Sequence, residues 1–259
     1  MATDNIYAVM QNIIHCPLIQ EVIDKGSGEC SKIVKSQSES YSSFSLNHFQ
    51  VPEPWRGHIE KANILFVSSN PGISFDENFP TWNWDVESIE TFFITCFDKG
   101  SKFTRDGIRY LKKDGTYSPA VRFWVTLKSI ANEVIENAIP GTDYAMTEVV
   151  HCKSPHEYGV KEACKICPQR YLSSVISLSP AKVIIVLGST AKGVFSSYYN
   201  ISTGKNHKLI GPIQIENVER YIVFLPHPNS FKPHKLSTNL SLKEIEILSQ
   251  FVKGKEVQA

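Results

Sequence analysis

The sequence predicts an α/β fold, a three-layer α/β/α sandwich around a four-stranded, mainly parallel sheet. Four short runs are almost entirely apolar, and segments with helical spacing separate them: residues 64–68, 144–150, 182–187 and 221–225. Strands that are apolar on both faces and alternate with helices are typical of a parallel sheet covered on both sides. An apolar content of 42% and a charged content of 20% fit a globular protein with a sizeable core.

The remaining segments fit this fold in chain order. Helices are expected over residues 4–25, with an interruption at Cys16 and Pro17, and over 86–97, 119–137, 160–178, 189–199 and 242–252. Asp85 can cap the helix that begins at residue 86. The connecting segments are a Ser- and Gly-rich irregular excursion over 26–50, an extended lead over 51–57, a polar surface loop over 100–118 and a short antiparallel or edge strand over 209–217.

Length and composition restrict the class of protein. We expect one domain over residues 1–259, with an N-terminal extension (1–58) and an α/β/α core (59–259). The net charge of +1 does not indicate a nucleic-acid-binding protein, so any DNA-binding face would have to be local. The absence of a membrane-spanning stretch and of a signal peptide favours a cytoplasmic protein, which we expect to be a monomer. In a reducing cytosol the six cysteines are expected to be thiols or metal ligands rather than disulfides.

Polar side chains follow three of the predicted strands. Asn70-Pro71-Gly72 ends the first, residues 148–152 end the second, and residues 227–230 (His-Pro-Asn-Ser) follow the fourth. Because the carboxyl ends of parallel strands meet at one edge of a sheet, these segments are expected to form a site there. The structural alternatives are a turn-forming role for Asn70 and a rigid surface turn around His227.

These motifs resemble those of the uracil-DNA glycosylase superfamily over about residues 60–235. Residues 68–72 (Ser-Ser-Asn-Pro-Gly) are similar to its Gly-x-Asn-Pro-Gly first motif, and residues 227–230 to its second. Val149-Val150-His151-Cys152, a helix ending near Tyr171-Leu172 and the strand over 182–188 resemble the iron–sulfur branches. The resemblance implies a monofunctional DNA glycosylase, a hydrolase acting on N-glycosyl bonds, which flips a base out of DNA and leaves an abasic site.

The resemblance also implies roles for individual residues. Asn70 would hold the attacking water, although an amide cannot act as a strong base, and His227 would donate a hydrogen bond to the 2-carbonyl oxygen of a pyrimidine. Ser69 and Gly72 would lie against the base, and Trp82 would stack on it. Phe75, Phe79 and Trp84 are rivals for the stacking role, and core packing is the alternative for each of these aromatic residues.

The loop after His227 is the expected DNA contact. Phe231 stands where the superfamily often has an apolar wedge that fills the gap left by a flipped base. Asn229, Ser230, Lys232 and Lys235 would bind the DNA around it. A plain basic loop is the alternative.

Glu148 is the difference from the family pattern that says most about the substrate. It occupies the position where the iron–sulfur branches carry a base-reading Asn. An ionised carboxylate only accepts hydrogen bonds, so it would accept from the exocyclic amine of cytosine and repel the 4-carbonyl oxygen of uracil. Gly72 leaves space beside C5 of the base. Together they favour a 5-modified cytosine, such as glucosylated hydroxymethylcytosine of phage DNA in antiphage defence, with uracil in DNA repair as the other substrate. A salt bridge at the strand edge is the alternative for Glu148.

The cysteines resemble the ligand plan of the iron–sulfur branches. That plan implies a 4Fe–4S cluster on Cys16, Cys30, Cys152 and Cys167, with Cys164 as an alternate ligand. Zinc on the same thiolates and buried free cysteines are the alternatives.

Two other functions compete with catalysis. Because the first motif lacks a strong base, the chain can be a non-catalytic module that binds modified or damaged DNA. A nucleotide-sensing α/β protein is less well supported, since residues 187–191 lack the glycines of a dinucleotide or P-loop fingerprint.

Overall fold

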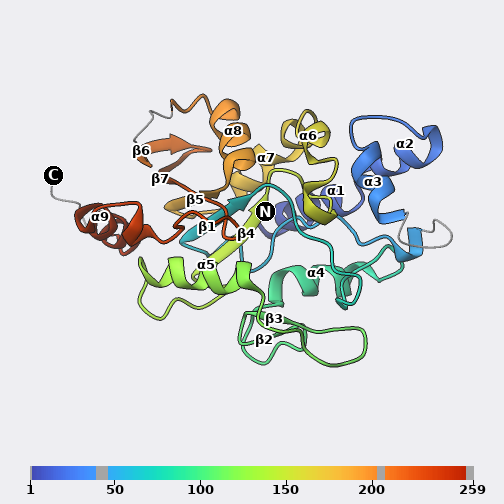
Figure 1. The fold of residues 1–259 in the computed structure, drawn as a ribbon, viewed down its shortest axis with the longest axis horizontal. Helices are drawn as coiled ribbons and strands as arrows, with labels where there is room; N and C mark the ends of the chain where they lie inside the picture. The colour runs from blue at the N-terminus through green and yellow to red at the C-terminus, as the bar shows by residue number, and fades with distance from the viewer. Residues whose placement is uncertain (1, 39–45, 203–207, 255–259) are drawn as a thin grey trace.

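The computed structural model describes residues 2–38, 46–202 and 208–254, which form a five-stranded sheet in the order β4-β1-β5-β7-β6 (Figure 1). The strands are β1 (Ile64–Ser68), β4 (Tyr144–Glu148), β5 (Val183–Leu187), β6 (Leu209–Ile215) and β7 (Val218–Leu225). The pairs β4–β1, β1–β5 and β5–β7 are parallel, and β6 pairs antiparallel with β7. The predicted α/β/α sandwich with a mainly parallel sheet is confirmed, and β6 is the antiparallel edge strand expected over 209–217, which brings the sheet from the four predicted principal strands to five.

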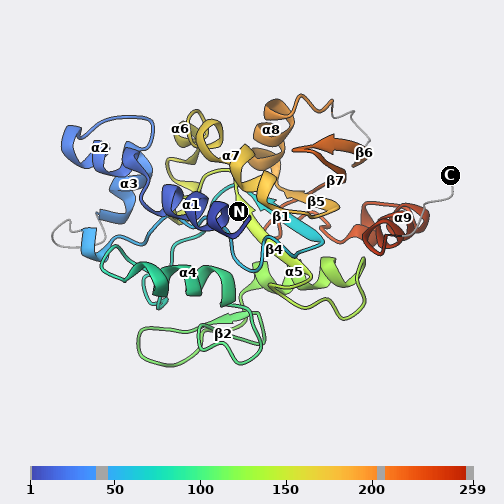
Figure 2. The same ribbon diagram turned by 180° about the vertical axis from the view of Figure 1, so that it is seen from behind.

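Helices cover both faces of the sheet. In Figures 1 and 2, α6 (Val160–Ala163), α7 (Cys167–Leu178) and α8 (Ser189–Tyr198) lie on one side, and α4 (Val86–Thr95) and α5 (Arg122–Asn132) lie on the other. At the N-terminal end, α1 (Ala2–Ile14) packs against α7, and α2 (Pro17–Lys25) packs against α3 (Ser31–Ser38). At the other end, α9 (Leu242–Val252) follows the last strand.

The central strands are buried along their whole length. Every residue of β1, β4 and β5 is buried, which explains why their sequences are continuous apolar runs without alternation. In β4 the buried residues include Thr147 and Glu148, whose polar groups need partners inside the protein. The Thr147 hydroxyl donates to the Pro54 carbonyl oxygen at 2.7 Å. At the carboxyl end of the strand, one oxygen of Glu148 has no hydrogen-bond partner among the described residues.

Proline divides two of the predicted helices. The interruption expected at Cys16 and Pro17 within residues 4–25 is confirmed, because Pro17, which has no N–H to donate, begins α2. The helix expected over 160–178 is divided into α6 and α7, with Pro168 in the first turn of α7. The helix expected over 119–137 is shorter, and Asp85 caps α4 as predicted by accepting a hydrogen bond of 2.8 Å from the backbone N–H of Ser88.

Two segments expected to be irregular contain short elements. The excursion over 26–50 includes α3, and the loop over 100–118 includes a small hairpin of β2 (Thr104–Arg105) and β3 (Arg109–Tyr110). Buried side chains of the N-terminal segment, such as Ile13 and Trp55, belong to the same hydrophobic cluster as those of the sheet. Within the described ranges, no helix is long and apolar enough to cross a membrane.

Candidate active site

A cavity of about 740 Å³ lies at the carboxyl ends of the parallel strands. Its wall contains residues from the ends of β1, β4, β5 and β7 and from the loops that follow them: Ser68 to Gly72, Glu148, Lys153 to Glu157, Leu187 to Thr190, His227, Asn229 and Ser230. The three polar strand ends singled out in the sequence therefore lie in one site. The end of β5 adds a fourth contribution that sequence reasoning did not anticipate.

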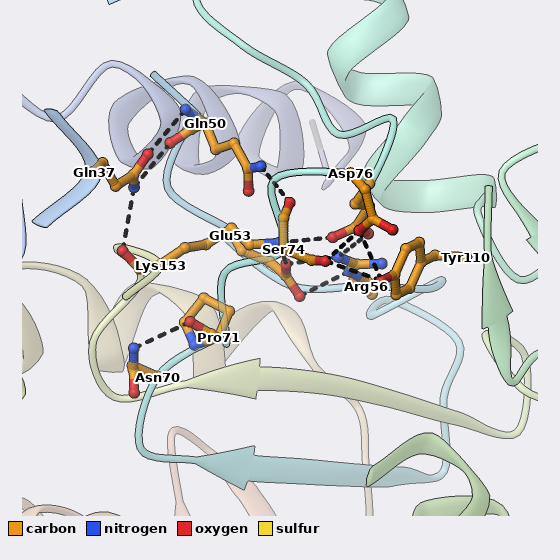
Figure 3. Close-up of polar contacts among 11 residues, drawn as sticks. Gln37, Gln50, Glu53, Arg56, Asn70, Pro71, Ser74, Asp76, Tyr110 and Lys153 are labelled. Atoms are coloured by element: carbon orange, nitrogen blue, oxygen red, sulfur yellow. Dashed lines mark hydrogen bonds and ion pairs between the residues drawn. The ribbon is translucent and has the colours of Figure 1, made fainter. Parts of the chain in front are cut away.

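Asn70 is held in place by its side-chain nitrogen. β1 ends at Ser68, and Nδ2 of Asn70 donates to the Pro71 carbonyl oxygen at 3.1 Å, the Ser154 hydroxyl at 3.1 Å and the Cys152 carbonyl oxygen at 3.4 Å. Figure 3 shows the first of these contacts. None of these bonds uses Oδ1, so this oxygen is the atom of Asn70 that can accept a hydrogen bond from a bound water.

His227 has a defined tautomer and ring plane. The backbone N–H of Asn229 donates to Nδ1 of His227 at 3.2 Å, which places the proton of the neutral ring on Nε2. Burial lowers the pKa of His227 below its ordinary value of 6.5, although the charge of Glu157 opposes this shift. Phe123 stacks on the imidazole, with 5.5 Å between the ring centroids and 29° between the planes. His227 is therefore a neutral, oriented hydrogen-bond donor near pH 7.

Gly188 allows this position of His227. It has a φ of 89°, in the region that favours glycine, and a Cβ added there would lie 3.2 Å from Cβ of His227. At the end of β5, Gly188 therefore contributes no functional group to the site, but its lack of a side chain lets His227 pack closely against it. This close approach is a reason for glycine at the strand end that sequence reasoning did not supply.

Glu148 is a cavity residue with one buried, unpartnered oxygen. Its side chain is buried, and among the described residues Oε2 has no hydrogen-bond partner. Burial and the charge of Glu53 raise the pKa of Glu148 well above its ordinary value of 4.5. The carboxyl group is therefore neutral at pH values where an exposed glutamate is ionised, and it can donate as well as accept. Glu148 is thus not restricted to accepting hydrogen bonds, as it would be in the ionised form considered from the sequence.

A cluster of four buried charges forms the floor of the cavity. Arg56 bonds Glu53 at 2.8 Å through Nε and Glu77 at 3.0 Å through Nη2, and Lys153 bonds Glu77 at 3.0 Å. Figure 3 shows Glu53, Arg56 and Lys153 close together beside the strand end that carries Asn70. Burial disfavours the charge of Glu77, yet Lys153 and Arg56 hold its pKa below the ordinary value. Nη1 of Arg56 is buried and has no hydrogen-bond partner among the described residues.

Glu157 is a further cavity residue that the sequence did not single out. It ends a short 3₁₀ turn, Pro155–Glu157, and its Oε1 accepts a short hydrogen bond from the Ser69 hydroxyl. Its exposed carboxylate lies near enough to His227 for its charge to influence the pKa of that residue. No local motif marks this glutamate, because its position depends on the path of the loop after Ser154.

The structure corrects the position expected for Trp82. Trp82 does not line the cavity, and its ring lies against His15, with 5.7 Å between the centroids. Phe75 and Phe79, two of its rivals, also lie outside the cavity lining. Phe123 is the aromatic residue that lines the cavity beside His227, so it is better placed for a stacking contact with a bound ring.

The loop after His227 is exposed as a DNA contact requires. Asn229 and Ser230 line the cavity, and Phe231 lies fully in solvent, with a relative exposure of 109%. Lys232 and Lys235 are also exposed. The loop therefore presents an apolar ring and positive charges beside the cavity mouth.

Four cysteines lie near one another outside the cavity lining. Cys16, Cys30, Cys152 and Cys167 are buried, and burial raises the pKa of Cys30 to about 12 and those of Cys152 and Cys167 well above the ordinary value of 9, with the neighbouring thiols adding to the shift. Cys164 is only half-buried, at the end of α6. In the part of the chain that the structure describes, no group of three or more His, Cys, Asp or Glu side chains is arranged to hold a metal ion.

Replacing Gly188 by alanine should disturb His227 selectively. The new methyl group would press on Cβ of His227 at a strained φ, so we expect a loss of stability of about 1–3 kcal/mol and a displaced imidazole. Urea unfolding and the NMR signals of the His227 ring measure the two effects. Gly193→Ala on α8 is the matched control, because nothing lies within 4 Å of the added Cβ and the backbone is helical. Unchanged ring signals in Gly188→Ala would contradict the close-approach argument.

The comparison with protein families agrees with this geometry. The family model described as the uracil DNA glycosylase superfamily matches residues 54–246, which include all four strand ends around the cavity. No curated protein matches the chain. Members of the superfamily are DNA glycosylases, hydrolases that act on bases in DNA. Because the match covers well over half of the 259 residues, the chain belongs to the uracil DNA glycosylase superfamily.

Proposed function

We propose that the protein is a monofunctional DNA glycosylase that flips a modified pyrimidine out of DNA and hydrolyses its N-glycosidic bond, leaving an abasic site. The favoured substrate is a cytosine with a substituent on C5, such as glucosylated hydroxymethylcytosine of phage DNA, in antiphage defence. Uracil, in DNA repair, is the second candidate. The observation that carries the proposal is that Asn70, Glu148 and His227 line one cavity.

His227 supports the departure of the base. When the N-glycosidic bond breaks, its electron pair stays on the pyrimidine, and negative charge develops at the 2-carbonyl oxygen. A neutral imidazole with its proton on Nε2 can donate a hydrogen bond to that oxygen. Contact with Phe123 and with the backbone of Asn229 holds the ring in position before the substrate binds.

Glu148 supports recognition of the Watson–Crick edge. A neutral carboxyl group can accept from the exocyclic amine of cytosine and donate to N3, and it can also pair with the 4-carbonyl and N3–H of uracil. An ionised carboxylate can still accept from the cytosine amine but repels the 4-carbonyl oxygen of uracil. At the C4 position an ionised Glu148 therefore favours the amine of cytosine over the carbonyl of uracil.

The cavity has room for a substituent on C5. No described residue has an atom within 4 Å of the position that a Cβ would occupy at Gly72. Beyond Gly72 the wall continues to Ser74, Glu77 and Tyr110, whose oxygen atoms suit the hydroxyl groups of a sugar. Figure 3 shows Ser74 and Tyr110 side by side, with their hydroxyl oxygens 2.9 Å apart. These features support a pyrimidine with a large polar substituent.

The loop after His227 supports DNA binding. Phe231 is free to enter the gap that a flipped base leaves, and Lys232 and Lys235 can contact phosphates. Asn229 and Ser230 lie between this loop and the cavity. The chain thus has a local positive surface at the site despite its small net charge.

Excision from defined oligonucleotides tests the proposal. DNA that contains uracil, hypoxanthine, hydroxymethylcytosine or its glucoside is incubated with the protein, and abasic sites are detected by alkaline cleavage. We expect most product from the glucosylated base and no covalent complex on borohydride addition, because Lys153 is buried and bonded to Glu77. Binding without product from any of these bases would favour a non-catalytic module.

Changing Glu148 to Gln should remove a pH dependence from base choice. In the wild type, rising pH ionises Glu148, so we expect excision of uracil to fall relative to that of the cytosine derivative. In Glu148→Gln the side chain stays neutral, and the ratio of the two rates should be constant with pH. Single-turnover rates on both substrates measure this ratio. A ratio that does not depend on pH in the wild type would remove the recognition role of Glu148.

The proposal includes a 4Fe–4S cluster on Cys16, Cys30, Cys152 and Cys167, with zinc as the alternative. Support comes from the burial of these four cysteines and from the mutual influence of their thiols on the pKa values of Cys30, Cys152 and Cys167, although the described side chains are not arranged as a metal site. A bound metal would stabilise the thiolates that burial disfavours. Such a cluster would hold the N-terminal helices to the core. We expect a brown protein absorbing near ~400 nm, and loss of this band in Cys152→Ser. A colourless protein with bound zinc would support the alternative, and one without metal would indicate free thiols.

A further inference from the structure

We propose that Glu157 is the general base that takes the proton of the attacking water. The assignment rests on the proposed glycosylase function and adds a residue to it. Asn70 can hold a water through Oδ1, but its neutral amide cannot accept a proton near pH 7. A carboxylate beside it would supply the missing group.

The contacts of Ser69 and Asn70 place Glu157 beside them. The Ser69 hydroxyl donates to Oε1 of Glu157, and Nδ2 of the next residue, Asn70, donates to the Ser154 hydroxyl at 3.1 Å. The backbone N–H of Ser154 also donates to the Pro71 carbonyl oxygen at 3.2 Å. The segment that follows β1 is thus joined side by side to residues 154–157, and Glu157 lines the same cavity as Asn70.

The backbone at Glu157 is unusual for a surface glutamate. His156 has a φ of 50° and Glu157 a φ of 58°, both in the left-handed region that residues other than glycine rarely adopt. Two such residues in succession cost free energy, and strained backbone of this kind concentrates at functional sites. Here the conformation brings the Glu157 side chain to Ser69. A glutamate that served only to keep the surface soluble would need neither the left-handed backbone nor the hydrogen bond from Ser69.

Glu157 and His227 line the same cavity, in which the sugar and the base of the substrate would lie. The charge of Glu157 also acts on the pKa of His227, which it raises against the effect of burial. The Ser69 hydroxyl occupies Oε1, and no described contact uses Oε2. This second oxygen is the one that would receive the proton.

The chemical step then balances. The water oxygen bonds to C1′ of the deoxyribose, one water proton moves to the Glu157 carboxylate, and the C1′–N bond breaks. Its electron pair leaves with the base, whose charge is stabilised by the hydrogen bond from His227. The base later takes a proton from solvent, and Glu157 returns its proton to solvent. Before it takes the proton, the negative charge of Glu157 also favours the positive charge that develops on the sugar.

Single-turnover excision by Glu157→Gln tests the assignment. We expect a rate about 10²–10⁴-fold below that of the wild type, with unchanged binding of the substrate DNA. Glu136→Gln, a change at an exposed glutamate outside the cavity lining, is the matched control and should retain the wild-type rate. Because Glu157 is exposed, its replacement is compatible with folding, which urea unfolding would check.

A second variant separates a chemical role from a structural one. Asn70→Asp places a carboxylate at the water-holding position, and in the Glu157→Gln background it should restore much of the lost rate. A rate within about threefold of the wild type in Glu157→Gln would overturn the assignment while leaving the proposed function intact. A slow Glu157→Gln enzyme that Asn70→Asp does not rescue would also overturn it. No excision by the wild type would overturn the proposed function and, with it, this assignment.

Discussion

The buried cluster of Glu53, Arg56, Glu77 and Lys153 is the interaction on which the site depends. Four charges removed from water are tolerated only because each lies against an opposite charge, with Phe79 under the lysine at 3.5 Å. The cluster joins the lead into β1, the loop after β1 and the segment after β4. Residues of these segments line the cavity. The ion pairs of the cluster therefore also determine the shape of the site.

The same balance determines the state of Glu148. The two positive charges of the cluster are matched by Glu53 and Glu77, and a further buried negative charge nearby would have no counter-ion of its own. Glu148 therefore favours its neutral form and keeps one oxygen unused. A polar atom left without a partner in a closed interior is unfavourable in the free protein, and a ligand that satisfies it gains affinity as a result. The site thus favours ligands that form a hydrogen bond with the unpartnered oxygen of Glu148.

Much of the fold could be predicted from local patterns, and the reasons are physical. Apolar runs and proline or glycine breaks define β1, β5 and β7, and Asn70 and His227 could be placed because each directly follows a strand. Trp82 could not be placed, since counting along an irregular loop does not determine the direction of a side chain. The ionic cluster could not be predicted either, because Glu77 and Lys153 meet only through tertiary packing. Glu157 escaped notice for a similar reason: two consecutive left-handed residues without glycine leave no mark in the sequence.

The short segment 152–154 belongs to three parts of the molecule at once. Cys152 lies among the thiols, the side chain of Lys153 belongs to the ionic cluster, and Ser154 holds Asn70. Gln37 of α3 donates to the Lys153 carbonyl oxygen at 3.2 Å, so the N-terminal helices also grip this segment (Figure 3). Because each of these three adjacent residues is held by a different contact, the position of each one restricts the positions of the other two. Through this segment, the N-terminal helices help to fix the position of Asn70. The geometry of the site therefore depends on residues well outside its sequence motifs.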